Sequence, residues 1–325
     1  MKKKLISLLF LCSVLVGVIP LALVAGASEN TATYIEDSDV PLKLWYDEEA
    51  LKENENSPAA STTGANEDIG WAHWSLPIGN GYFGANVFGR TETERIQITE
   101  KTLMNPTSVK DSDGTWYTIG GLNSFSETYI DFNHTNSDVT DYNRYLDLKT
   151  AISGVEYTYG GVKYTREYFT SYPDKALIIR LDADKDGKLS FTLRPTIPYE
   201  ETHGAFVGDG VTKSGTVTAS VENGVGQIEL AGKMGYYDID FLGLYRVYTN
   251  GGTVSASSVQ NTYKDTDGAT ITDTDGTIVV NGATSAYIVV TLGTDYAPGN
   301  LPNPGMEPMS LTSPTWVVGR KIPYH

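Results

Sequence analysis

Carboxylates are the side-chain groups in this sequence that can take the most chemical roles, because Asp and Glu can act as acids, as bases and as metal ligands. The chain has 325 residues, of which 40 are aspartate or glutamate, 4 are histidine and 1 is cysteine. The histidines show neither the spacing of a metal site nor the order of a serine–histidine–aspartate triad. Several glutamates occur in strand-like or turn contexts, and no neighbouring residues single one out as a catalytic acid: Glu94, Glu100, Glu127, Glu156, Glu167, Glu200 and Glu201. The sequence therefore assigns no catalytic residue.

One run of aspartates has the spacing of a calcium loop. Asp182, Asp184 and Asp186 alternate before Gly187, as at the start of an EF-hand. The twelfth position, where an EF-hand has a bidentate glutamate, is Leu193, and the flanking residues predict strands rather than helices. The segment is therefore predicted to be a solvated turn, and neither a metal nor a cofactor is expected.

The glycine-rich segment Leu76–Gly89 is the most distinctive motif. Its glycines permit tight turns and close backbone approach. A phosphate-binding loop is excluded because no lysine and no helix start follow it. Two interpretations stay open: a turn that lets two strands pass closely, or a loop that faces a neighbouring domain and lines the rim of a binding pocket. The second interpretation makes Trp74, Asn80 and Tyr82 the candidate substrate-binding residues.

The first 27 residues have the composition of a secretory signal peptide. A basic start is followed by an almost wholly apolar run from Leu5 to Ala25, and Ala25–Ala27 has the small-residue pattern that signal peptidase cleaves. An uncleaved anchor is the alternative, because the run is about long enough to span a bilayer. We expect a secreted, extracellular protein with no membrane association after cleavage. Cys12 lies within the signal, so the mature protein is predicted to have no disulfide.

Charge and aromatic content limit the partners. The formal net charge is −16, so the electrostatic field of the protein repels nucleic acids and anionic lipid surfaces. Neutral carbohydrates are not repelled, and the 21 tyrosines and 5 tryptophans supply ring faces that can stack on sugars. Aromatic residues also fit the pleated surface of a sheet, which is the simpler explanation for most of them.

Alternating apolar and polar residues predict an all-β protein. Val155–Tyr159 and Val162–Tyr168 flank Gly160-Gly161, which permits the positive φ angles of a two-residue hairpin turn. A second hairpin is predicted for Ala176–Leu181 and Leu189–Leu193, around Asp184–Gly187. Further strands are expected at Leu42–Tyr46, Gly215–Glu222, Gln227–Ala231, Gly243–Thr249, Thr253–Ser257, Thr277–Val280 and Ala286–Leu292.

Many short antiparallel strands in one long domain predict a large two-sheet antiparallel β-sandwich. Asp265–Gly268 and Asp273–Gly276 are predicted to be turns, and no helix of three turns or more is expected. The predicted organisation is a signal peptide at 1–27, a flexible lead at 28–41, the sandwich at 42–297 and a proline-rich, irregular tail at 298–325.

The segment from Trp74 to Gly89, together with Thr93–Leu103, resembles the opening of the N-terminal domain of glycoside hydrolase family 95, the bacterial α-L-fucosidases. The resemblance covers roughly residues 42–296 and is also specific at Tyr145–Pro173. It implies a sandwich of the glycosyl hydrolase N-terminal supersandwich type and action on fucosylated glycans. Tyr82 stands where many family members have arginine, a departure that bears on the choice between fucose and L-galactose.

In that family the catalytic carboxylates lie in a helical barrel downstream of the sandwich. The resemblance implies an inverting hydrolysis by a glutamic acid and a water activated through aspartate and asparagine side chains, and no residue here matches those roles. We therefore expect the catalytic barrel to be missing from this chain and the isolated chain to be inactive.

Two alternatives remain open. The chain could be a free-standing carbohydrate-binding module, which requires an exposed aromatic stripe formed by Tyr157, Tyr159, Tyr164 and Tyr168. It could also be half of a split enzyme that binds a separately encoded helical catalytic domain, which requires an exposed apolar patch beside Leu76–Gly89.

Overall fold

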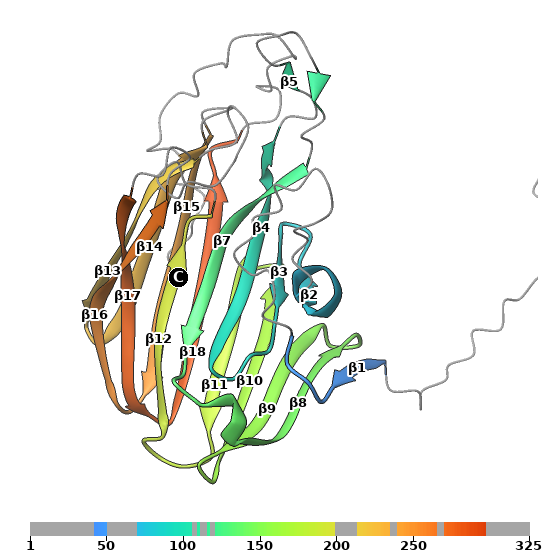
Figure 1. The fold of residues 1–325 in the computed structure, drawn as a ribbon, viewed down its shortest axis with the longest axis vertical. Helices are drawn as coiled ribbons and strands as arrows, with labels where there is room; N and C mark the ends of the chain where they lie inside the picture. The colour runs from blue at the N-terminus through green and yellow to red at the C-terminus, as the bar shows by residue number, and fades with distance from the viewer. Residues whose placement is uncertain are drawn as a thin grey trace, which may run out of the picture. The chain divides into compact units, whose positions relative to one another are not determined.

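The computed structural model describes residues 42–50, 70–105, 109–110, 116–117, 121–198, 213–234, 239–264 and 270–296, all in the compact unit that begins at Leu42 (Figure 1). Several expectations fall outside these residues: the signal peptide, the flexible lead, the Asp265–Gly268 turn and the tail. Within the described part, no helix is long and apolar enough to cross a membrane.

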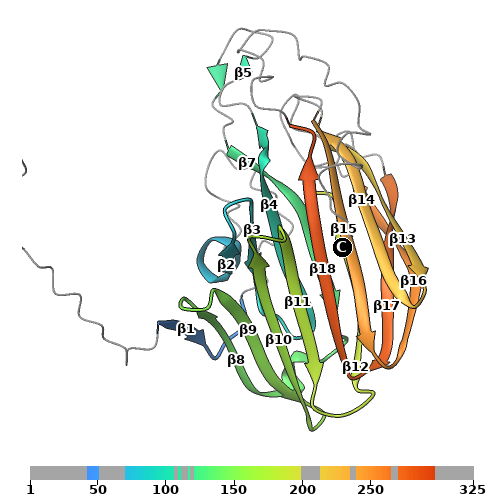
Figure 2. The ribbon, with the colours of Figure 1, turned by 180° about the vertical axis from the view of Figure 1, so that it is seen from behind.

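Nine strands form one antiparallel sheet, in the order β1-β8-β9-β10-β11-β18-β15-β14-β13 (Figure 2). Seven strands form the other large sheet, in the order β16-β17-β12-β7-β4-β3-β2. The nine-stranded sheet comprises β1 Lys43–Tyr46, β8 Val139–Asp147, β9 Ile152–Tyr159, β10 Val162–Ser171, β11 Ala176–Ala183, β13 Lys213–Glu222, β14 Val225–Met234, β15 Ile239–Asn250 and β18 Ser285–Thr294. The seven-stranded sheet comprises β2 Leu76–Gly79, β3 Phe83–Val87, β4 Thr93–Asn105, β7 Gly121–Asp131, β12 Leu189–Thr196, β16 Thr253–Lys264 and β17 Thr270–Ala283.

The remaining elements are short. Strands β5 (Val109–Lys110) and β6 (Trp116–Tyr117) pair with each other. Helical turns occur, within the described residues, only at the π-helical η2 (Gly70–Trp74) and the 3-10 turn η3 (Asn136–Asp138). The expectation that long helices are absent is confirmed for this part of the chain.

The two large sheets pack face to face and enclose one hydrophobic core (Figures 1 and 2). Strand β12 shows how the sequence dictates this: Leu189, Phe191 and Leu193 are buried, whereas the residues between them are half-buried. Successive side chains of a strand point to opposite faces, so alternation places one apolar row against the other sheet. The predicted all-β, two-sheet antiparallel sandwich is confirmed.

The hairpin at Gly160-Gly161 is confirmed in detail. Tyr159 pairs with Val162, and the two glycines have φ angles of 57° and 72°. Both values lie in the left-handed region that the two central residues of a type I′ turn require, where glycine carries no Cβ penalty.

The second predicted hairpin is wrong. Strand β11 pairs with β10 and β18, whereas β12 belongs to the other sheet and pairs with β17 and β7. The backbone N–H of Asp184 donates to the Lys163 carbonyl at 2.9 Å, and its carboxylate accepts from the Lys163 N–H at 2.9 Å. Asp184 therefore fixes the start of the β11–β12 connection to the β9–β10 hairpin. This connection crosses from one sheet to the other and is not a hairpin turn.

The alternating aspartates of the same segment bind other residues of the chain. Asp182 accepts from Arg180, with an Nε–Oδ2 distance of 2.6 Å. No group of three or more potential metal-ligating side chains occurs among the described residues. The alternating aspartates here have structural partners within the chain.

The predicted turn at Asp273–Gly276 is also wrong, because this segment lies inside β17. Asp275 is buried and accepts from the Asn261 side chain at 3.0 Å. Gly276 lies where β17 meets β13 of the opposite sheet: a Cβ there would be 2.5 Å from the Ala219 nitrogen and 2.6 Å from the Thr218 carbonyl carbon. The glycine is needed for close packing of two backbones, not for a turn.

Replacing Gly276 by alanine should therefore lower the free energy of unfolding by about 1–3 kcal/mol, the usual cost of overpacking a core. The clash is with backbone atoms, which cannot rotate away as a side chain would. Gly84→Ala is the matched control, because a Cβ on this strand glycine would meet nothing closer than the Ile78 carbonyl oxygen at 3.5 Å. Urea unfolding of both variants measures the difference, and equal stabilities would contradict the close packing.

The aromatic stripe expected for a carbohydrate-binding module faces the core, so that prediction is wrong. Tyr157, Tyr164 and Tyr168 are buried, and Tyr159 is half-buried. Their rows alternate with half-buried or exposed residues such as Lys163 and Thr165 on the outer face. The alternating pattern is confirmed, but the row of side chains that faces outward is the one that contains Lys163 and Thr165.

Candidate functional site

The turn between β2 and β3 is built around Asn80. Its Oδ1 accepts from the backbone N–H groups of Tyr82 and Phe83 at 2.9 and 3.0 Å, and its Nδ2 donates to the Ser171 carbonyl at 2.8 Å. Gly81, between them, has a φ of 77°, which a residue with a Cβ rarely adopts. The amide of Asn80 thus fixes the β2–β3 turn to the turn that follows β10, and it positions Tyr82.

Tyr82 lies half-buried between two ammonium groups. The Nζ atoms of Lys101 and Lys175 are 5.0 and 5.2 Å from the centre of its ring. Both distances are within the range of cation–π attraction. Burial, and secondly the negative charge of Glu100, raise the pKa of Tyr82, so its hydroxyl remains a hydrogen-bond donor at neutral pH. The turn therefore combines a ring face, a phenol donor and two cations.

Glu100 lies beneath this turn and is buried. Its Oε2 accepts from the backbone N–H groups of Thr102 and Leu103 at 2.7 and 3.0 Å and from the Thr102 hydroxyl at 2.6 Å. Burial raises the pKa of Glu100 despite these donors. The register of β4 against β7 is interrupted between Thr99 and Met104, where the carboxylate binds these freed N–H groups. Because the carboxyl group has no solvent access, its geometry supports the bulge rather than acid catalysis.

Trp74 is remote from the Asn80 turn. It ends η2, before β2, whereas Asn80 follows β2, so the whole of this strand, roughly 13 Å long, lies between them. Its carbonyl accepts from Nη1 of the buried Arg144 at 2.5 Å. The structure thus brings Asn80 and Tyr82 together and places Trp74, also half-buried, at the other end of the strand.

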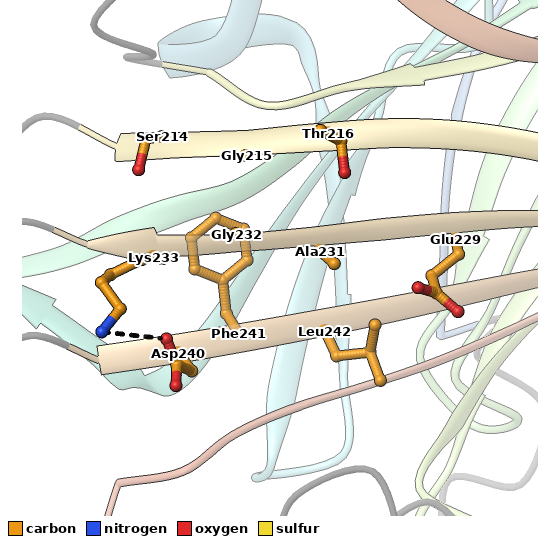
Figure 3. Close-up of a pocket in the computed structure, with 10 residues that line it drawn as sticks. All are labelled: Ser214, Gly215, Thr216, Glu229, Ala231, Gly232, Lys233, Asp240, Phe241 and Leu242. Atoms are coloured by element: carbon orange, nitrogen blue, oxygen red, sulfur yellow. Dashed lines mark ion pairs between the residues drawn. The ribbon is translucent and has the colours of Figure 1, made fainter. Parts of the chain in front are cut away.

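A pocket of about 400 Å³ lies on the outer face of β13, β14 and β15 (Figure 3). Ala231 and Leu242 line it together with the polar side chains of Ser214, Thr216, Glu229, Lys233 and Asp240. Lys233 forms an ion pair with Asp240 at 3.4 Å, the dashed contact in Figure 3. The volume falls within the range of small-molecule sites.

A carboxyl group beside this pocket has an altered pKa. The backbone N–H of Asp240 donates to Oδ1 of Asp295 at 3.0 Å. Burial, and then the charge of Asp240, raise the pKa of Asp295 to about 6. The pocket therefore offers hydroxyls, carboxylates and an ammonium group, a set that can hydrogen-bond a neutral polar ligand.

The sequence from 44 to 112 and from 117 to 299 matches the family model described as the N-terminal domain of glycosyl hydrolase family 65. These residues include both large sheets and the Asn80 turn. The chain belongs to this family. As a glycosyl hydrolase N-terminal domain, it carries the sandwich that the motif at Trp74–Gly89 predicted.

Two curated proteins resemble this N-terminal domain over part of its length. Alpha-L-fucosidase 2 of Arabidopsis thaliana is 29% identical over 147 residues, which cover 36% of this chain and 17% of that protein. An α-fucosidase A from Aspergillus oryzae is 31% identical over 132 residues, which cover 39% of this chain and 17% of that protein. The chain thus matches only 17% of the length of either relative, and the resemblance to the N-terminal domain of fucosidases is confirmed.

A solved structure described as a kojibiose phosphorylase from the human microbiome also matches. It superimposes with a TM-score of 0.41 at 16% identity, and the match covers 78% of this chain and 34% of that one.

The most buried charged cluster of the domain was not anticipated from the sequence. Glu94 accepts from the Tyr168 hydroxyl at 2.8 Å and from the Gly89 N–H at 2.7 Å, and it lies 3.4 Å from Nη1 of Arg166. All four residues are buried. The cluster fixes the loop after β3 to strand β10, and its closure to solvent makes it structural rather than catalytic.

A pattern in the sequence could have revealed this cluster. Strict alternation along β4 places Glu94, Ile96, Ile98 and Glu100 on one face. Since the two isoleucines must face the core, the two glutamates flanking them must do so as well, and all four are buried.

Proposed function

We propose that this domain is the N-terminal sandwich of a secreted α-L-fucosidase-like hydrolase that acts on fucosylated glycans outside the cell. The observation that carries the proposal is the match to two proteins named as α-fucosidases, together with the match of this chain to a glycosyl hydrolase N-terminal domain family. The signal-like first 27 residues support secretion.

The described carboxylates support chemistry located outside this domain. Glycoside hydrolysis needs two carboxyl groups about 5–9.5 Å apart across an open pocket. Glu94 and Glu100 are buried. Glu229 and Asp240 both line the pocket, but Glu229 pairs with Leu244, four residues along β15 from Asp240, so the two backbones are roughly 14 Å apart. The two acidic side chains that line the pocket are therefore not placed as such a pair.

The Asn80 turn is the part of the domain that we assign to the substrate. We propose that Tyr82, held by Asn80 and flanked by Lys101 and Lys175, lines the rim of a sugar pocket that a helical catalytic domain completes. Trp74, at the opposite end of β2, would contact a different part of that domain.

A separately encoded catalytic partner is the second candidate, and one surface favours it. Exposed apolar side chains lie on both faces of the edge strand β1, just before it and just after β8, and we call them the β1 strip: Leu42, Leu44, Trp45 and Leu148. This strip adjoins the Trp74 segment, because Arg144, which pairs with Tyr46 of β1, donates to the Trp74 carbonyl. Exposed apolar side chains of this kind are what binding to a separate catalytic domain would cover.

The isolated chain should release no L-fucose from 2′-fucosyllactose, because the two carboxylates that line the pocket, Glu229 and Asp240, are not placed for the reaction. The measurement is a coupled assay for free fucose, with a known active α-L-fucosidase as the positive control. A rate within about a hundredfold of a typical kcat, which is about 10 s⁻¹, would contradict this expectation.

The substrate itself is tested in a joined polypeptide. The genomic DNA beyond the codon for His325 should be searched for a reading frame that encodes a helical domain, and the chain should be expressed together with it. Release of fucose by the pair supports the proposal, and release of another terminal sugar alone would overturn the assignment of fucose.

A further inference from the structure

Two exposed tyrosines lie side by side on the outer face of the nine-stranded sheet. Tyr248 of β15 and Tyr287 of β18 are direct register partners, with 39% and 46% of their surfaces exposed. The residues next to them in the strands, Val247 and Ile288, are buried in the core. Alternation therefore directs both rings away from the sandwich.

An arginine held by two carboxylates continues the row. Arg180 of β11 pairs in register with Tyr287 on one side and with Glu167 of β10 on the other. Its guanidinium forms ion pairs with Glu167 at 3.2 Å and with Asp182 at 2.6 Å. The positive charge is thus balanced locally, and the partly exposed guanidinium lies on the strand next to Tyr287.

A second row of outward-facing side chains is polar, and it lies next to the first row on the side toward the β17–β18 connection. Asp182, Ser285 and Asn250 are register partners on β11, β18 and β15. Each lies two residues along its strand from the first row, a separation of about 7 Å. These side chains place acceptors and donors beside the two rings. We call Tyr248, Tyr287, Arg180, Asp182, Ser285 and Asn250 together the tyrosine platform.

We propose that the tyrosine platform binds a neutral glycan chain that lies across β11, β18 and β15. Ring faces bury the apolar faces of sugars, while phenol, guanidinium, carboxylate and amide groups meet the hydroxyls around them. The mixed polar surroundings do not suit an apolar protein face, in which charged groups are depleted at the centre. An anionic polymer is disfavoured by the two carboxylates at the arginine and by the net charge of −16.

The platform is separate from the sites described above. Leu242, which lines the pocket, is six residues along β15 from Tyr248, a separation of roughly 20 Å. The inference goes beyond the proposed function, because glycan binding here requires no cleavage of fucose. If the chain binds glycans but releases no fucose, the proposal for the tyrosine platform stands even though the assignment of fucose as substrate fails.

Affinity electrophoresis through native gels that contain fucosylated xyloglucan or galactomannan, two neutral polysaccharides, tests the platform. The unmodified chain should be retarded by at least one of them. Tyr248→Thr and Tyr287→Thr should each raise the Kd about tenfold, equivalent to about 1.4 kcal/mol, and the double variant should migrate as in a gel without polysaccharide. Threonine removes the ring but suits a strand, so the sheet is retained.

Tyr172→Thr is the matched control, since Tyr172 is 75% exposed outside the platform and should leave retardation unchanged. Tyr287→Phe, which keeps the ring face, should retain most of the binding. The proposal is overturned if neither polysaccharide retards the chain, if the double variant is retarded as the unmodified chain is, or if Tyr172→Thr weakens binding equally. Circular dichroism of each variant confirms that the fold is kept.

Discussion

Replacing Glu94 by alanine should lower the free energy of unfolding by about 3–5 kcal/mol, enough to unfold a marginally stable domain. Glu94 and Arg166 are both buried, and their ion pair spans 3.4 Å. The variant leaves the guanidinium buried without its counter-charge, and this uncompensated charge is the main cost.

The same carboxylate satisfies several donors at once. Its Oε1 accepts from the N–H groups of Gly89 and Arg95 at 2.7 and 3.1 Å, and its Oε2 accepts from the Tyr168 hydroxyl at 2.8 Å. Burial raises the pKa of Tyr168 well above its usual value; the positive charge of Arg166 opposes this rise and the negative charge of Glu94 adds to it, so this phenol stays a donor that needs an acceptor. Each buried donor left without a partner adds to the loss.

The measurement is urea unfolding of Glu94→Ala and of a matched control, Glu156→Ala. Glu156 also forms an ion pair, with Lys163 at 2.7 Å, but both side chains are substantially exposed. Exposed pairs contribute about 0–1 kcal/mol, so the control should be nearly as stable as the unmodified chain. If the two variants lose similar stability, the buried pair does not hold the loop as argued. Glu94→Gln, which keeps an acceptor, should lose less than Glu94→Ala.

Local features of the fold followed directly from the sequence. The Gly160-Gly161 hairpin depends only on residues that adjoin each other, and the structure reproduces its register. The strand positions followed from alternation in the same way, with ends extended by a few residues; for example, the expected Gly243–Thr249 is part of β15, Ile239–Asn250. Glycine conformations and side-chain alternation act over a few residues and need no knowledge of the partner sheet.

Features that depend on distant partners could not be predicted in this way. Asp184–Gly187 and Asp273–Gly276 have the same kind of turn chemistry, yet the first crosses between the sheets and the second lies inside β17. What distinguishes them is the backbone of β13 against Gly276, which is remote in the sequence. The same limit applies to the candidate site: Asn80 and Tyr82 adjoin and stay together, whereas Trp74 is separated by the whole of β2.

The outer face of the nine-stranded sheet shows what alternation alone leaves undecided. A strand has two rows of side chains, and which one is covered depends on the second sheet. Tyr157 and Tyr164 belong to the covered row, and Tyr248 and Tyr287 belong to the uncovered one. Aromatic content alone therefore could not show which rings are available to a sugar, and the residues that could take part had to come from the packing.

His134 should make the stability of the domain depend on pH. It is 7% exposed, and its ring stacks on Tyr159 with centroids 4.3 Å apart and lies 4.6 Å from the ring of Tyr164. Its Nδ1 is 3.0 Å from the Tyr157 hydroxyl. Burial, and then the charge of Arg166, lower the pKa of His134 to about 4.

The direction of the effect follows from where protons bind. The unfolded chain has a histidine pKa of about 6.5 and takes up a proton below that pH, whereas the folded chain does not until about pH 4. Stability is therefore fully present above pH 6.5 and falls as the pH drops from 6.5 to 4. The pKa difference corresponds to a loss of about 3 kcal/mol across this window.

Urea unfolding at pH 7 and pH 4 measures this loss in the unmodified chain and in His134→Phe, which keeps an aromatic ring among the tyrosines but cannot bind a proton. Other groups titrate in both proteins and cancel in the difference, so the unmodified chain should lose about 3 kcal/mol more than the variant. His73→Phe is the control, because the ring of His73 is exposed, and it should keep the pH dependence of the unmodified chain. If His134→Phe loses as much stability as the unmodified chain, the ring of His134 must already accept a proton in the folded state, and the aromatic surroundings do not exclude its charge.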